Sequence, residues 1–164
     1  LKPNFSAVDV GCGNGWVCRQ LSNNEDCSKI IGIDGSEEMI LKAKKIDPAG
    51  EYYHTLLPSW EPKEKYDFIH SMEFLYYLED PLEMLKNFYN SWLENDGVLI
   101  AGIDYYLENE DSHSWPEKLN VHMTKLSIDE WKKGMLDAGF KEVEIHQVAA
   151  SEDFIGTLVM FGKK

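Results

Sequence analysis

The chain has 164 residues, enough for one globular domain with a buried core and short for two. Hydrophobic residues make up 43% of it and aromatic residues 12%, as in globular proteins, and no apolar run approaches the ~20 residues of a membrane helix. Acidic residues outnumber basic ones 29 to 16, and the formal net charge is −13. This charge opposes binding to a polyphosphate strand, so nucleic acid is an unfavourable partner.

The three cysteines predict no metal site. Cys12, Cys18 and Cys27 lack the paired C-x-x-C spacing of zinc and redox motifs. We therefore assign them no chemistry and expect a reducing, cytoplasmic setting. The chain begins at Leu1 without a signal segment, so we expect further residues to precede it in the full protein.

The first third of the chain alternates between strand and helix patterns. Residues 7–10 form a short apolar run that stops at Gly11, and residues 16–21 fit a helix. Residues 29–33 read as a second strand, which ends at Asp34. Together these segments predict a βαβ unit and hence a parallel sheet.

The alternation continues through the middle of the chain. Ser36 is a good N-cap for a helix that Pro48 ends. Residues 51–55 and 66–70 read as the third and fourth strands. The Asp-Pro step that opens 80–92 caps a further helix, whose apolar residues lie on one face and suit core packing.

The last part of the chain predicts a buried strand, a helix and a hairpin. Residues 95–97 fit a turn, and residues 98–103 are a nearly continuous apolar run, as in a central strand buried on both faces. Residues 105–125 have no clear period and are either an active-site cover or a surface connection. A capping box predicts a helix over 127–138. Two strands complete the chain and fit an antiparallel pair at a sheet edge: 142–148 and 154–161.

The most informative segment is Val8–Gly15, a strand that enters a glycine-rich turn and then a helix. Its three glycines, Gly11, Gly13 and Gly15, are one residue tighter than the dinucleotide fingerprint G-x-G-x-x-G. A nicotinamide-dependent oxidoreductase therefore stays only as an alternative. Glycine lets the backbone approach a ligand closely, and ligands bind at this edge of an open α/β sheet.

Two carboxylates accompany the glycine turn. Asp9 precedes the first glycine by two residues, where it disfavours a pyrophosphate and suits a ligand with an ammonium and a sulfonium. Asp34 ends the neighbouring strand, where it can accept hydrogen bonds from a ribose diol. These residues point to S-adenosylmethionine.

The chain resembles the class I S-adenosylmethionine-dependent methyltransferases. The likeness runs through five segments: 8–15, 32–39, 66–81, 97–104 and 126–143. It implies an α/β fold of the Rossmann-like, doubly wound type. We expect a mostly parallel seven-stranded sheet, helices on both faces and an antiparallel C-terminal edge hairpin. It also implies a single domain over residues 1–164 that lacks the family's usual N-terminal helices.

The resemblance implies a set of cofactor-binding residues. Asp9 would orient the methionine amino group, Asp34 would bind both ribose hydroxyls, and Gly35 with Met39 would border the adenine. No acid follows the third strand to bind the adenine amino group, a departure from many relatives. The complete set is Asp9, Gly11, Gly13, Asn14, Gly15, Asp34, Gly35, Met39, Thr55, Leu56, Ser71, Met72 and Glu73.

The resemblance implies transfer of a methyl group by in-line displacement to a small-molecule acceptor. The acidic surface favours an amine. Catalysis rests mainly on holding the acceptor near the methyl carbon, and the candidates for a catalytic role are Asp104, Tyr105 and His113. A surface or packing role remains open for each of them. The alternative function is a non-catalytic module that binds the cofactor or a protein.

Overall fold

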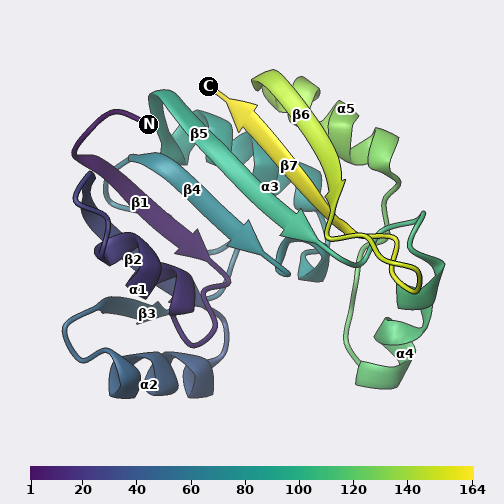
Figure 1. Cartoon of the computed structure of the whole chain (residues 1–164), viewed down its shortest axis with the longest axis horizontal. Coiled ribbons are helices and arrows are strands. Elements are labelled where there is room, and N and C mark those ends of the chain that lie inside the picture. Colours follow the sequence, from purple (N-terminus) through teal and green to yellow (C-terminus); the bar gives the residue numbers. More distant parts are fainter.

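The computed structural model describes all residues, 1–164, and contains one seven-stranded sheet in the order β3-β2-β1-β4-β5-β7-β6 (Figure 1). The strands are β1 (Phe5–Val10), β2 (Cys27–Asp34), β3 (Glu51–His54), β4 (Tyr66–Met72), β5 (Leu93–Ile103), β6 (Lys141–Val148) and β7 (Thr157–Lys163). The α-helices are α1 (Trp16–Ser22), α2 (Glu37–Ile46), α3 (Pro81–Asn87), α4 (Trp115–Leu119) and α5 (Ile128–Ala138). Three shorter helical segments are η1 (Leu75–Tyr77), η2 (Phe88–Trp92) and η3 (Glu110–Ser114).

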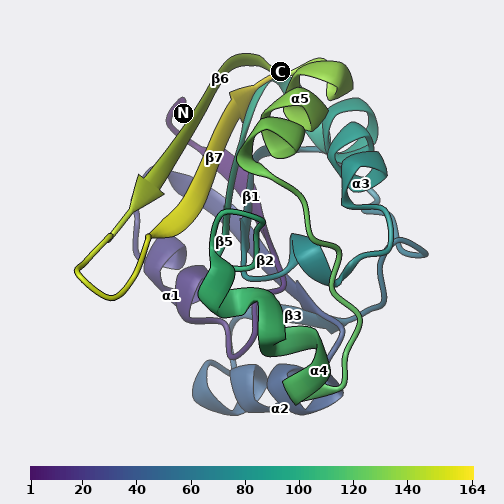
Figure 2. The same cartoon turned by 90° about the vertical axis from the view of Figure 1, so that its right-hand side faces the viewer.

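The sheet is parallel except at its C-terminal edge. β1 pairs in parallel with β2 and β4, and β4 with β5, whereas β7 runs antiparallel to both β5 and β6. Helices α3 and α5 lie on one face and α1 on the other (Figure 2). The predicted doubly wound fold with a C-terminal hairpin is confirmed. The last strand, β7, is inserted next to β5, so that β6 forms the edge.

Local capping signals place the helices where the sequence predicts them. The Ser36 side chain accepts a hydrogen bond from the backbone N–H of Met39, 3.3 Å away, at the start of α2. Asp80 does the same for the N–H of Glu83, at 2.9 Å, and Pro81 occupies the first helical position of α3.

The region between α3 and β5 differs from the sequence prediction. The helix expected to reach Trp92 ends at Asn87 and continues as the π-helical η2, and β5 begins at Leu93 rather than 98. The reason lies in the pairing with β4: Tyr66 pairs with Leu93, and Phe68 with Val98. The residues between Leu93 and Val98 bulge out of the strand. The turn predicted at 95–97 lies within this bulge, so that it does not precede β5.

The segment predicted to lack a period, 105–125, folds into η3 and α4. Tyr106 anchors it, since this side chain is buried and its hydroxyl donates to the carbonyl oxygen of Gly156 at 2.7 Å. Both helices have five residues, too few to give a helical pattern in the sequence.

The main core lies between the sheet and helices α3 and α5. It contains 26 buried side chains, among them Phe88, Trp92 and Trp131. The longest helix, α5, has 11 residues, and no helix has the length and apolar character needed to cross a bilayer.

Candidate functional site

The turn after β1 is built by glycines with different surroundings. Gly13 has a φ of +52°, and a Cβ placed on it would have no atom within 4 Å. Gly15 has a φ of +76°, and a Cβ there would overlap the ring of Tyr52. Both positions favour glycine through the backbone. Gly13 in addition leaves open space in front of the loop, whereas Gly15 allows close packing behind it.

Asp34 ties the glycine turn to the end of β2. One of its carboxylate oxygens, Oδ2, accepts from the backbone N–H of Gly13 at 2.8 Å, and Oδ1 accepts from the N–H of Ser36 at 2.7 Å. An ionised carboxylate offers about four acceptor positions. Asp34 therefore keeps capacity for a ligand diol while it fixes the loop.

Asp9 is a buried anion with a histidine partner. The residue is 2% exposed, and His70 Nδ1 lies 2.7 Å from its Oδ1. Because an ionised carboxylate only accepts, Nδ1–H is the donor. The contact arises because Asp9 on β1 is in register with His70 on β4. Sequence analysis missed His70, for which the only signal was a polar residue at the end of an apolar strand pattern.

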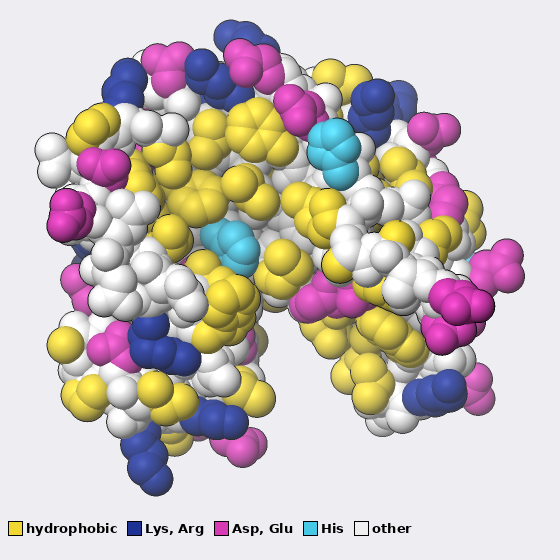
Figure 3. Space-filling view, viewed as in Figure 1, with side chains coloured by type: hydrophobic (Ala, Val, Ile, Leu, Met, Phe, Trp, Pro, Cys, Tyr) yellow, Lys and Arg dark blue, Asp and Glu magenta, His cyan; other side chains and the backbone are white.

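A cleft of about 330 Å³ lies at the carboxyl ends of β1 and β4, which we name the loop cleft. Figure 3 shows the molecule hollowed at this edge, between the part that carries α2 and the part that carries α4. Its lining includes seven of the predicted cofactor-binding residues: Asp9, Gly11, Gly13, Asn14, Met39, Met72 and Glu73. It also includes four that were not predicted: Cys12, Trp16, Val17 and His70.

The other predicted residues lie outside this lining. Thr55 donates its backbone N–H to the carbonyl oxygen of Asp34 at 3.0 Å. Leu56 lies against Gly35, 3.5 Å from an added Cβ. These residues therefore gather beside Asp34. Ser71 is buried and donates its hydroxyl to the carbonyl oxygen of Val10 at 3.1 Å, which leaves its side chain no opening to the cleft.

Glu73 and Asp104, which we name the carboxylate pair, directly follow the adjacent strands β4 and β5. Glu73 lines the loop cleft with a φ of +53°. Its Oε2 accepts from the hydroxyl of Tyr76 at 3.0 Å. Its Oε1 is buried without a hydrogen-bond partner, and so is Asp104 Oδ1. Burial, and then the charge of Asp104, raise the pKa of Glu73 to about 7, against the lowering effect of Tyr76.

The structure separates the three candidates for a catalytic role. Asp104 lies beside Glu73 and raises its pKa. Tyr105 is buried, and its ring packs edge-on against Tyr76 with centroids 5.7 Å apart. His113 lies in η3, where its Nε2 is 2.9 Å from the carbonyl oxygen of Leu107. Of the three, Asp104 is the one held against a residue of the loop cleft.

Comparison with known proteins identifies the family. Residues 1–145 match the family described as a methyltransferase domain. The chain belongs to this family. Solved structures that share its fold include S-adenosylmethionine-dependent methyltransferases, which use the cofactor that the sequence resemblance predicts. In open α/β sheets, ligands bind at the carboxyl ends of the parallel strands. The loop cleft lies at these ends of β1 and β4.

Curated relatives share part of their length with this methyltransferase domain. A malonyl-[acyl-carrier protein] O-methyltransferase of Halalkalibacterium halodurans is 28% identical over 163 aligned positions, which cover 90% of this chain and 59% of the relative. A trans-aconitate 2-methyltransferase of Escherichia fergusonii is 28% identical over 132 positions, which cover 80% of this chain and 48% of the relative. The chain therefore spans about half the length of these relatives.

Solved structures share the fold almost completely. The methyltransferase of Haloferax volcanii, solved in complex with the Trm112 methyltransferase activator, superposes with a TM-score of 0.85 at 25% identity, over 99% of this chain and 83% of that one. An S-adenosylmethionine-dependent methyltransferase from Mesorhizobium loti has a TM-score of 0.82 at 18% identity, over 99% and 92%.

The loop cleft fits the cofactor of this family. The open space in front of Gly13 is a cradle that a single methyl group would occupy. The side-chain oxygen of Asn14, Oδ1, is buried there without a partner, and a buried polar atom of this kind gains free energy when a ligand donates to it.

Proposed function

We propose that this domain transfers the methyl group of S-adenosylmethionine to a small-molecule amine. The observation that carries the proposal is that the Gly13 cradle and Glu73 line one cleft, with Asp104 beside Glu73 as the second member of the carboxylate pair. The Gly13 cradle suits the cofactor, and the carboxylate pair suits an acceptor that is cationic before it reacts.

Within this proposal, Asp34 binds the ribose hydroxyls with the acceptor capacity that its two backbone contacts leave. Asp9 acts as a buried negative charge beneath the methionine amino group, held in place by His70. Gly35 and Leu56 border the adenine from beside Asp34, together with Met39.

When bound, S-adenosylmethionine supplies a methyl group on a positively charged sulfur, which becomes a neutral thioether once a nucleophile takes the methyl group. The chain needs no nucleophile of its own and contributes mainly orientation. An ammonium must lose a proton before its nitrogen lone pair can attack. Glu73 accepts that proton, because its pKa of about 7 suits a general base at neutral pH.

The carboxylate pair also argues against a carboxylate as the acceptor. The two curated relatives named above act, by their names, on malonyl-[acyl-carrier protein] and trans-aconitate, both of which carry carboxyl groups. Beside Glu73 and Asp104 a third carboxylate would be repelled in a partly buried site, whereas an amine is attracted. We therefore propose that this domain differs from them in acceptor class.

The test is formation of S-adenosylhomocysteine from S-adenosylmethionine with a panel of aromatic and aliphatic amines, and with trans-aconitate and malonate esters as the carboxylate arm. We expect turnover with at least one amine and none with the carboxylates. Glu73→Gln should lower kcat at neutral pH by about a hundredfold, the usual effect of losing a general base.

The matched control is Glu79→Gln, which removes an exposed acid a short distance along the chain. We expect it to leave turnover unchanged. Methylation of the carboxylates in preference to every amine would refute the acceptor class. Equal kcat in Glu73→Gln and the control would refute the role of Glu73.

A further inference from the structure

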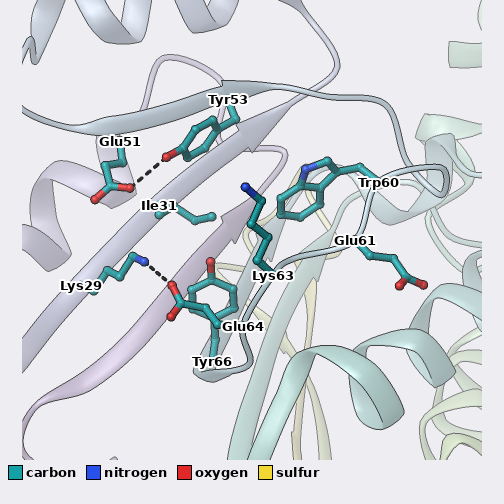
Figure 4. Close-up of a pocket in the computed structure, with 9 residues that line it drawn as sticks. All are labelled: Lys29, Ile31, Glu51, Tyr53, Trp60, Glu61, Lys63, Glu64 and Tyr66. Carbon is teal, nitrogen blue, oxygen red and sulfur yellow. Dashed lines mark hydrogen bonds and ion pairs between the residues drawn. The ribbon is translucent and has the colours of Figure 1, made fainter.

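A second pocket lies away from the loop cleft. It has a volume of about 340 Å³ and opens on β2, β3, β4 and the connection that follows β3 (Figure 4). We name it the aromatic pocket. Its lining shares no residue with that of the loop cleft. Tyr66 and Glu51 stand at the first positions of β4 and β3, so the pocket lies toward the strand ends opposite the cofactor edge.

The pocket exists because the connection between β3 and β4, residues 55–65, contains no helix. In a doubly wound sheet such a crossover is usually helical and covers the neighbouring strands. Here the connection is anchored by Trp60, whose ring packs edge-on against Trp92 with centroids 5.3 Å apart. The side chains of Ile31 and Tyr66 therefore stay accessible from the pocket.

Three aromatic rings line the pocket. Tyr53 is 46% exposed, and the indole of Trp60 faces it across the opening. Tyr66 is only 3% exposed, yet its hydroxyl points into the pocket and makes no hydrogen bond with the chain. Rings of this kind bind a planar ligand by stacking, and the hydroxyl offers that ligand a polar contact at the base of the pocket.

The charged groups of the lining differ in whether they are already paired. Lys29 forms an ion pair with Glu64, and the hydroxyl of Tyr53 donates to Glu51 at 3.0 Å. Lys63 has no ion pair, and Figure 4 shows its ammonium between Tyr53 and Trp60. Glu51 and Glu61 have no ion pair either: the carboxylate of Glu51 is held by the Tyr53 hydroxyl, and that of Glu61 points away from the group (Figure 4). Lys63 is therefore the unpaired cation that faces the pocket, while the Glu51 carboxylate stays beside Tyr53.

We propose that the aromatic pocket binds a small planar aromatic carboxylate. Its ring stacks on the indole of Trp60, its carboxylate meets the ammonium of Lys63, and a polar group on the far side of the ring meets the hydroxyl of Tyr66. The volume suffices for one such molecule. This site is independent of the proposed methyl transfer, because the two linings are separate.

The test follows the indole N–H signal of Trp60 by nuclear magnetic resonance as 4-hydroxybenzoate is added to the whole chain. We expect a saturable shift. Lys63→Met should weaken binding about tenfold through loss of a charge-assisted hydrogen bond. Tyr66→Phe, which removes only the hydroxyl, should weaken it about threefold. The neutral analogue 4-hydroxybenzamide should bind wild type about tenfold more weakly than the acid does.

The matched control is Lys132→Met, which removes an exposed lysine on α5, and it should leave the affinity unchanged. Saturating S-adenosylhomocysteine should also leave it unchanged. The proposal is overturned by an absent or unsaturable Trp60 shift in wild type, by equal affinities of Lys63→Met and Lys132→Met, or by displacement of the probe by S-adenosylhomocysteine. Since no outcome depends on turnover, failure here would leave the proposed methyl transfer intact.

Discussion

Gly13 and Gly15 share a positive φ, but they face different neighbours. A methyl group added at Gly13 should mainly lower ligand affinity, whereas one added at Gly15 should mainly lower the free energy of unfolding. In Gly13→Ala the backbone strain costs about 1 kcal/mol of unfolding free energy, and the methyl group occupies the cradle. We expect affinity for S-adenosylhomocysteine to fall by at least about tenfold. Chemical unfolding and titration calorimetry of the same variant measure the two effects.

Gly15→Ala is the matched comparison. The same backbone strain applies, and the added methyl group also overlaps the ring of Tyr52. We expect a loss of about 3 kcal/mol of unfolding free energy. Gly13→Ala could instead be the less stable of the two, or could bind S-adenosylhomocysteine as wild type does. Either result would contradict the assignment of Gly13 to the cofactor cradle and of Gly15 to packing against Tyr52.

Glu73 should make stability depend on pH. Its pKa in the folded state, about 7, lies above its ordinary value of 4.5. The protonated form is therefore the one that favours folding. Its stabilising contribution is complete below the ordinary value and is lost as pH rises through about 7. Glu73→Gln keeps a neutral side chain at every pH and should escape this loss.

We expect the unfolding free energy of Glu73→Gln, relative to wild type, to improve by about 3 kcal/mol between about pH 4 and pH 8. Urea unfolding at the two pH values measures it, and the carboxyl carbon shift of Glu73 gives the titration directly. A constant difference between variant and wild type would contradict a raised pKa at this residue.

At the level of single elements, α5 depends on its capping box. The Ser127 hydroxyl accepts from the backbone N–H of Glu130 at 3.2 Å, and the Glu130 side chain accepts from the N–H of Ser127 at 2.8 Å. Ser127→Ala should cost about 1 kcal/mol of unfolding free energy. Ser114 holds the N-cap position of α4 without a side-chain cap, so Ser114→Ala should cost little in the same unfolding assay. Equal losses would contradict the capping account.

The elements also show how far the sequence predicts the structure. Caps such as Ser36 and Asp80 act within a few residues, so the starts of α2 and α3 follow from the sequence alone. The start of β5 does not, because it depends on its pairing with Tyr66 in a distant strand. The same reason hid the contact between Asp9 and His70, which only the register of β1 and β4 brings together.

At the scale of the whole molecule, the loop cleft is assembled from chain segments that are far apart. The turn after β1, the start of α2 and the end of β4 all contribute to it. The glycine spacing, a local signal, predicted the first, and the family resemblance implied Met39 at the start of α2. The carboxylate pair, in contrast, needs β4 and β5 to lie side by side. The sequence offered Glu73 and Asp104 only as separate candidates.

The measurement that tests the central claim most directly is titration calorimetry of S-adenosylhomocysteine into wild type, Asp34→Asn and Asp26→Asn. Asp26 is an exposed acid directly before β2, at the end of that strand opposite Asp34, and serves as the control. We predict one-site binding to wild type and to Asp26→Asn, and affinity at least about tenfold weaker in Asp34→Asn, which loses a charge-assisted contact to the ribose diol. A folded wild type that binds no S-adenosylhomocysteine, or an Asp34→Asn variant that binds it as wild type does, would contradict the account.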